Sequence, residues 1–326
     1  MTAQARTAAA SQPVAATRLV EVVCDESGYE GEKHIGAVTD VFTHASVLLD
    51  VASAEACVLE LRRRIRSPAE EYKANHLLRE KNRSALVWLL GPSGPLRGTA
   101  HVYLVDKPYF LVDKLVELLI DEPGDMALTL HRQGRNAYGD QPWAAFLESA
   151  NNLLRSKDRL DLTTSVEDFY RAIEGLRGDE SGAETSLGEI MQRLWHTRPR
   201  AEAFRRRIFD DPTVLPVLDP LFPALFRAVA YWGQGTRPVT IIHDRQNTLS
   251  HDRVAQIQMR GLTLVDSFSD PRVQVADFLA GTARKIASEE LNGRGDAELT
   301  ALLPPFMDAM SIWGDGRSWS RLAPTS

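Results

Sequence analysis

The sequence predicts an α/β fold in which a sheet is flanked by helices and interrupted by a helical insertion. Four short β-branched runs are almost continuously apolar, and each ends in an acid. Segments with helical periodicity separate them, as expected when strands are buried on both faces of a sheet. A fifth stretch, 121–212, has helical periodicity and no segment typical of a strand. This stretch is therefore predicted to be a helical insertion.

The four apolar runs are the predicted strands. They are "RLVEVVCDES" (18–27), "AHVYLVDKP" (100–108), "PVTIIHDRQ" (238–246) and "LTLVDSFSD" (262–270), with the acids Asp25, Asp106, Asp244 and Asp266. The segment "IGAVTDVF" (35–42) follows the first run so closely that we expect it to be the antiparallel hairpin partner of that run.

Helices are predicted from apolar periodicity over 53–66, 81–90, 109–120, 143–155, 214–232, 250–260 and 271–290. The last has a strong start signal, with Asp270 as N-cap and Pro271 as first helical residue. Its broad apolar arc is rich in alanine, so the helix can pack closely on the sheet. Asp277 lies at the edge of this arc, where it either faces a site at the sheet or forms a salt bridge with Arg284 or another base.

Composition limits the class of protein. The chain of 326 residues is 44% hydrophobic and 25% charged, which is ordinary for a globular protein of one elaborated domain or two. The net charge of −6 argues against a generally basic nucleic-acid-binding surface and leaves a local patch open. Two cysteines suit the cytoplasm, and no apolar run approaches the roughly 20 residues of a membrane helix. We expect 1–18 to be a disordered tail.

Acids at the ends of several strands suggest a site, because ligands in open α/β sheets bind beyond the carboxyl ends of the strands. Any one acid alone is better explained as a turn residue or helix N-cap. Several acids together favour a common site. The segment "SPAEEYKANHLL" (67–78) adds Glu71 and Lys73, which point to the same side if this segment is extended. Taken alone, that segment is better explained as a solvated charged loop.

Five motifs carry a resemblance to a known family. They are "CDESGYEG" (24–31), "EYKA" (71–74), "VYLVDK" (102–107), "IIHDR" (241–245) and "DPRVQVADFLAG" (270–281). With them the chain resembles a family of uncharacterised bacterial proteins marked by an N-terminal DESG strand and a C-terminal Q-x-ADFLAG helix. That family is similar to RNase H-like proteins. The resemblance implies an RNase H-like core over 19–120 and 213–292, with 121–212 as the helical insertion and 293–326 as a C-terminal extension.

The resemblance also implies chemistry, since RNase H-like nucleases gather three or four carboxylates around Mg²⁺ or Mn²⁺. Asp25 is the expected central ligand, and Glu71, Asp244 and Asp277 are expected to complete the cluster. Lys73 is expected to stabilise the charge that develops on phosphate. The implied function is a metal-dependent phosphodiesterase or nuclease. The alternative is a scaffold of the same fold that binds a protein or nucleic-acid partner without cleaving it.

Two details of this expected site rest on local sequence. Asp106 competes with Asp244 for the second strand-borne position. We favour Asp244, because it leads into a loop, whereas Asp106 precedes Lys107, a ready salt-bridge partner. Gly28 is expected to let the backbone turn and to leave room for a phosphate.

Other features say less about function. Two arginine-rich segments, "LRRRIR" (61–66) and "RPRAEAFRRRIF" (198–209), either track phosphates or form ordinary ion-paired surfaces. Ser27 lacks the G-x-S-x-G elbow of a serine nucleophile. His243 and His251 lack further placed ligands for zinc, and there is no glycine-rich phosphate loop. DNA, RNA and nucleotides all remain open as substrates, and the oligomeric state is not predicted.

Overall fold

The structure is a computed structural model. It describes residues 19–66, 77–121, 124–156, 162–177, 186–211, 213–246, 248–249, 255, 257 and 259–325. Three predicted features lie outside these residues: the tail 1–18, the segment 67–76 with Glu71 and Lys73, and most of the helix expected at 250–260. Among the helices that are described, none is long and apolar enough to cross a membrane.

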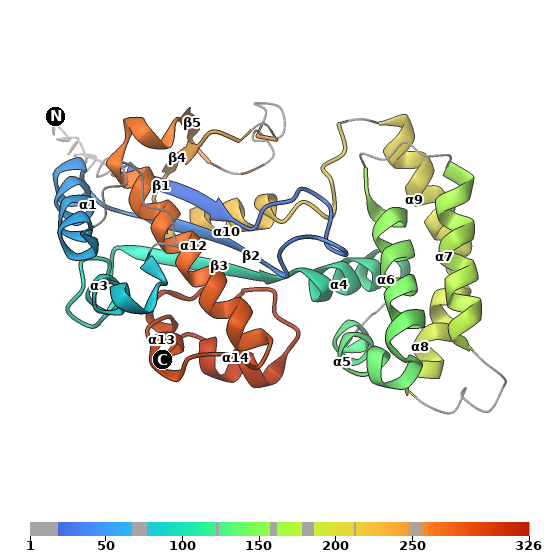
Figure 1. Ribbon diagram of the computed structural model, residues 1–326. Helices are drawn as coiled ribbons and strands as arrows, with labels where there is room; N and C mark the ends of the chain where they lie inside the picture. Colours follow the sequence, from blue (N-terminus) through green and yellow to red (C-terminus); the bar gives the residue numbers. More distant parts are fainter. Residues whose placement is uncertain are drawn as a thin grey trace, which may run out of the picture.

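A five-stranded mixed sheet forms the centre of the molecule (Figure 1). The strands are β1 (Val20–Ser27), β2 (Val41–Val47), β3 (Ala100–Asp106), β4 (Val239–Asp244) and β5 (Gly261–Val265), in the spatial order β3-β2-β1-β4-β5. β1 pairs antiparallel with β2, and β2 with β3, whereas β4 is parallel to both β1 and β5. The predicted α/β class is thereby confirmed.

The predicted boundaries of the hairpin partner were wrong. β2 begins at Val41 rather than at 35, and residues 29–40 form a long connecting loop. The carboxylate of Glu30 accepts hydrogen bonds from the N–H groups of Val38 (2.8 Å) and Thr39 (3.0 Å), so these groups are not available to a neighbouring strand. The side chain of Val38 is 95% exposed, so the apolar residues in this part of the loop do not belong to a buried strand.

Helices cover both faces of the sheet (Figure 1). On one face lie α12 (Pro271–Leu291), α1 (Val51–Ile65) and α3 (Arg83–Leu90), preceded by the short 3-10 turn η1 (Glu80–Asn82); α10 (Leu221–Gly233) lies on the other face. The start of α12 is as predicted, with the Asp270 carboxylate accepting the N–H of Arg272. α10 starts at Leu221 and not at 214, because Pro216 and Pro220 lack the N–H groups that a continuous helix needs.

The described residues of 121–212 form helices in a lobe beside the sheet (Figure 1). Its helices are α5 (Met126–Tyr138), α6 (Asp140–Leu154), α7 (Leu162–Arg177), α8 (Ser186–Trp195) and α9 (Arg198–Asp210). They pack with α4 (Lys107–Leu119) around an apolar cluster distinct from the clusters on the sheet. Because α4 follows β3 directly, this helix joins the lobe to the sheet.

The C-terminal segment covers the outer strand β3. It contains α13 (Ala297–Thr300), η4 (Pro304–Phe306) and α14 (Gly316–Leu322), and bridges join Met307 to Val102 and Ile312 to Val105. The buried carboxylate of Asp308 is bonded by His101 (2.8 Å) and Arg227 (3.0 Å for both contacts). The edge of the sheet is thus protected from pairing with another chain.

Candidate functional site

Asp25 is a buried acid close to the end of β1, with only 6% of its surface exposed. One carboxylate oxygen accepts the N–H of Glu26 at 2.7 Å. The pKa of Asp25 is raised to about 9, first by burial and then by the negative charges of Glu26, Asp277 and Asp244. A carboxyl this close to other carboxylates holds a proton near neutral pH unless a cation is supplied.

Asp244 reaches this site through strand register. β1 and β4 are parallel with Cys24 opposite His243, so Asp25 and Asp244 follow at the next position of each strand. Both side chains then point to the face covered by α12, because side chains alternate along a strand. The structure therefore brings Asp244 into electrostatic contact with Asp25.

Asp106, the competing acid, has another role. It lies on β3, two strands from β1, and its carboxylate caps α4 by accepting the N–H of Tyr109 at 3.2 Å. It also accepts the N–H of Gly314 at 3.4 Å. The predicted Asp106–Lys107 ion pair is wrong: the Lys107 ammonium donates instead to Glu30 (2.9 Å) and Thr39 (2.7 Å).

Asp277 comes to the site from α12. The alanines of this helix, among them Ala276, Ala280 and Ala283, are fully buried, which allows the helix axis to lie close to β1 and β2. Asp277 itself is half-buried. Arg284, the base considered as its alternative partner, donates from Nε to Ser27 Oγ at 2.9 Å.

The three acids suit a hard cation in kind, because Mg²⁺ and Mn²⁺ prefer carboxylate oxygens. Burial is the main cause of the raised pKa of Asp25 and the charges of the neighbouring acids add to it; a bound cation would relieve this repulsion. Within the described part of the chain, no three side chains of Asp, Glu, His or Cys are arranged to hold a metal ion. Glu71, the fourth expected ligand, and Lys73 lie outside that part.

The opposite face of the sheet holds a second polar group that the sequence did not predict. Glu26 alternates away from Asp25, and its carboxylate lies 3.5 Å from Nε2 of His243. On the neighbouring strand β2, His44 lies directly opposite Glu26. Neither ring nitrogen of His44 has a hydrogen-bond partner in the described structure, and burial lowers its pKa well below the usual value. The only feature of the sequence that could have indicated this polar group is the presence of histidine within apolar strands. The other half of the rejected zinc pair, His251, lies outside the described residues.

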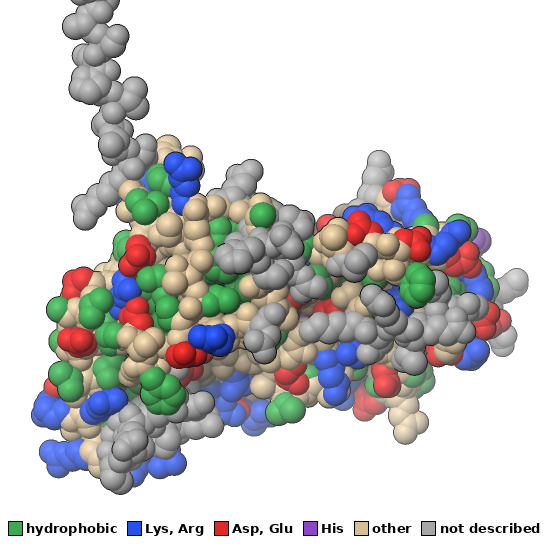
Figure 2. Space-filling view, turned by 90° about the horizontal axis from the view of Figure 1, so that it is seen from above, with side chains coloured by type: hydrophobic (Ala, Val, Ile, Leu, Met, Phe, Trp, Pro, Cys, Tyr) green, Lys and Arg blue, Asp and Glu red, His purple; other side chains and the backbone are tan. Residues whose placement is uncertain are grey.

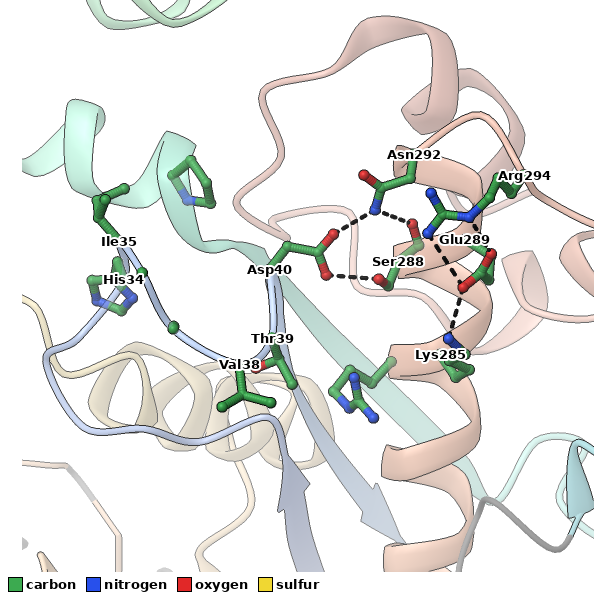
Figure 3. A pocket seen from close by; sticks show the side chains of 14 residues that line it. His34, Ile35, Val38, Thr39, Asp40, Lys285, Ser288, Glu289, Asn292 and Arg294 are labelled. Carbon is green, nitrogen blue, oxygen red and sulfur yellow. Dashed lines mark hydrogen bonds and ion pairs between the residues drawn. The ribbon is translucent and has the colours of Figure 1, made fainter. Parts of the chain in front are cut away.

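A cleft of about 570 Å³ lies between the loop 34–40 and the C-terminal half of α12 (Figure 3). Figure 3 shows Asp40 reaching across from the loop to Ser288 and Asn292. The Asp40 carboxylate accepts from Ser288 Oγ at 2.6 Å and from Asn292 Nδ2 at 2.5 Å. The loop is thereby attached to the helix at one end of the cleft.

The helical lobe holds the same loop from the other side. The side-chain oxygen of Asn151, on α6, accepts the N–H groups of His34 (2.9 Å) and Ile35 (3.1 Å), and its amide donates to the carbonyl of Glu32 (2.8 Å). His34 Nε2 lies 2.6 Å from the carbonyl oxygen of Leu218. One wall of the cleft is thus positioned by residues of the lobe.

Gly28 joins the cleft to the acids. Its φ of +79° is in the left-handed region, so the backbone turns there as predicted. The predicted room for a phosphate at Gly28 is wrong: a Cβ would meet the carbonyl of Val41 and, at 2.7 Å, the Cδ of Arg284. The aliphatic part of Arg284 fills this space.

The two arginine-rich segments are largely engaged in ion pairs. In α1, Arg63 and Arg64 both bond Glu60. In α9, Arg198 pairs with Glu202, and buried Arg205 donates to backbone carbonyls of α6 and the residue after it. Figure 2 shows acidic and basic side chains interspersed over the lobe. These contacts favour the ion-paired-surface interpretation of both segments.

Comparisons with protein-family models, with curated proteins and with solved structures gave no match.

Proposed function

We propose that the protein is a metal-dependent phosphodiesterase of RNase H-like fold that cleaves nucleic acid. The observation that carries the proposal is that Asp244 on β4 and Asp277 on α12 are both near enough to the buried Asp25 on β1 for their negative charges to raise its pKa. Bringing like charges together is costly, and a protein that only binds a partner has no need of it. Mg²⁺ or Mn²⁺ would remove that cost.

The position of the acids supports the same reading. β1 and β4 are adjacent parallel strands, and their acids lie close to the carboxyl ends, where ligands bind in open α/β sheets. The mixed sheet flanked by helices also agrees with the architecture that the DESG and Q-x-ADFLAG motifs imply.

Each group has a distinct task in the proposed reaction. Asp25, Asp244 and Asp277 would hold the metal, with Glu71 as a further ligand and Lys73 beside the phosphate. When bound, the metal would activate water and stabilise the leaving oxygen. Asp25 must be deprotonated to act as a ligand, so metal binding should release its proton and should weaken as the pH falls.

A cleavage assay with acid-to-amide variants tests the proposal. Single-stranded, duplex and hybrid substrates are incubated with Mn²⁺ or Mg²⁺ and with wild type, Asp25→Asn, Asp277→Asn or the control Asp266→Asn, whose carboxylate pairs with Arg245 at the surface. We expect Asp25→Asn and Asp277→Asn each to lower the rate by about 100-fold or more, and Asp266→Asn to cleave like wild type.

Two results would contradict the proposal. Tight, metal-independent binding without cleavage of any substrate would favour the non-catalytic scaffold. Cleavage that persists undiminished in both Asp25→Asn and Asp277→Asn would mean that another site or a contaminant is responsible.

A further inference from the structure

We propose that the cleft between the loop 34–40 and α12 binds a phosphate group of the nucleic-acid strand, and that the guanidinium of Arg284 is its main ligand. The identity of the strand rests on the proposed function. The argument for an anion in this cleft comes from the cleft itself.

Arg284 differs from the other cations that line the cleft. Lys285 and Arg294 both pair with Glu289, at 2.7 and 2.8 Å, and Figure 3 shows these two bonds. Arg284 has no carboxylate ion pair among the described residues, and its Nε donates to the hydroxyl of Ser27. An arginine that is half-buried without a direct counter-ion leaves guanidinium donors for a planar or tetrahedral oxyanion.

The nearby acids do not serve as that counter-ion, because each is occupied. Asp40 accepts from Ser288 and Asn292. Glu30 accepts from Lys107 and from two backbone N–H groups of the loop. Burial lowers the pKa of Arg284, and the charges of Asp40 and Glu30 oppose this only from a distance. A bound anion would supply the counter-charge that the guanidinium of Arg284 lacks within the described structure.

The charge of the cleft agrees with an anionic ligand. Its lining holds three cations, Arg284, Lys285 and Arg294, against the two carboxylates of Asp40 and Glu289. The lining is therefore net positive in a protein whose formal net charge is −6. A local positive cleft of this kind concentrates phosphate.

The spacing along α12 relates the cleft to the acids. Arg284 follows Asp277 by seven residues, two turns, so both lie on nearly the same side of the helix. Seven residues correspond to about 10 Å along the axis. A strand that is cleaved at the acids can therefore place one of its neighbouring phosphates in this cleft.

Fluorescence anisotropy in EDTA tests binding without cleavage. The probe is a labelled 12-nucleotide single-stranded DNA, titrated at several salt concentrations with wild type, Arg284→Gln, Arg284→Lys and Arg294→Gln. We expect Arg284→Gln to weaken binding about tenfold and to reduce the salt slope by about one. Arg284→Lys should recover part of the loss, and Arg294→Gln should weaken binding less than Arg284→Gln does, because the guanidinium of Arg294 is already paired with Glu289.

Titration with inorganic phosphate shows whether the cleft binds free phosphate as well as a nucleic-acid strand. At constant ionic strength, phosphate should raise the Tm of wild type and compete with the DNA probe, and Arg284→Gln should lose both effects. If Arg284→Gln does not fold, Ala37→Asp, which puts a carboxylate on the loop wall, provides the same test and should also weaken DNA binding. Phosphate binding without DNA binding would overturn the strand assignment.

The two proposals can fail separately. Unchanged DNA binding by Arg284→Gln and Ala37→Asp, with metal-dependent cleavage by wild type, would overturn the cleft proposal alone. Loss of DNA binding in both variants, with no cleavage by wild type under any metal condition, would overturn the nuclease proposal and leave the cleft proposal standing.

Discussion

Asp25 and Glu26 are neighbours in the chain, yet their carboxylates lie on opposite faces of β1 and meet different surroundings. Asp25 faces α12 and shares its site with Asp244 and Asp277. Glu26 faces the α10 side, where the amide of Gln246 donates to it and His243 lies 3.5 Å away. A shift of one residue in strand register would therefore exchange the positions of Asp25, the proposed metal ligand, and Glu26.

The raised pKa of Asp25 predicts how stability depends on pH. Because the folded-state pKa is about 9 and the ordinary value is 3.8, this group stabilises the fold fully below pH 3.8, and the contribution is lost as the pH rises towards 9. In EDTA at pH 8, Asp25→Asn should therefore be more stable than wild type by at least about 1 kcal/mol, or roughly 2 °C in Tm.

Thermal melts of both proteins between pH 5 and 9 measure this effect, with Asp266→Asn as the exposed control. The advantage of Asp25→Asn should grow with pH and should shrink when Mg²⁺ or Mn²⁺ is added, because the metal stabilises only wild type. An Asp25→Asn protein that is less stable than wild type at pH 8 in EDTA would show that the carboxylate is not under repulsion.

At the scale of elements, the loop 28–40 decides the shape of the cleft. The contacts that hold it include Glu30 with Lys107, Asp40 with α12, and Asn151 with the backbone at 34–35. Asn151 is 3% exposed, so its amide replaces both water and strand pairing as the partner of these N–H groups. The lobe thus supplies one of the contacts that position the loop.

Asn151→Ala should release this wall of the cleft. Two buried N–H groups would lose their acceptor, at a cost of about 1–3 kcal/mol, and hydrogen exchange at His34 and Ile35 should become much faster. The neighbouring Asn152 is exposed, so Asn152→Ala is the matched control and should exchange like wild type. Equal exchange rates at 34–35 in the two variants would contradict this role of Asn151.

These elements also show what the sequence can and cannot predict. Apolar runs ending in acids located four of the five strands, β1, β3, β4 and β5, to within a few residues. The alanine-rich arc with Asp277 at its edge indicated how α12 packs. The same reasoning was wrong for the loop 29–40, because the apolar residues Ile35 and Val38 are typical of a strand. Their backbone is held by Asn151 and Glu30, and pairing over such sequence separations leaves no periodic signal.

The same limit applies to the candidate site. Asp25, Asp244 and Asp277 were expected together because strand ends and helix edges have regular geometry. The cleft and Arg284 were not expected, because they depend on where a long loop lies against α12. The Lys107–Glu30 pair was missed for the same reason: its partners are 77 residues apart.

At the scale of the whole molecule, two bodies with separate apolar cores meet at α4 and at the loop 28–40. The lobe cluster includes Phe146, Phe169 and Leu194, and the α10 side of the sheet has its own cluster with Phe42. α4 contributes to both, with Phe110 towards the sheet and Leu115 towards the lobe. Proposed chemistry and phosphate binding lie on the sheet, whereas the lobe positions one wall of the cleft.

This division predicts that damage to the lobe core spreads to the cleft before it reaches the sheet. Phe169 is fully buried in the lobe, and Phe169→Ala should cost about 3–5 kcal/mol of local stability. Hydrogen exchange should accelerate in α6, α7 and the loop at 34–35, while the amides of β1 and β4 keep wild-type protection. Phe42→Ala, an equally buried change on the sheet, should instead accelerate exchange in β1, β2 and β3. If Phe169→Ala and Phe42→Ala both accelerated exchange throughout the molecule, the lobe and the sheet would unfold as one unit, and the lobe could not adjust the cleft independently of the acids.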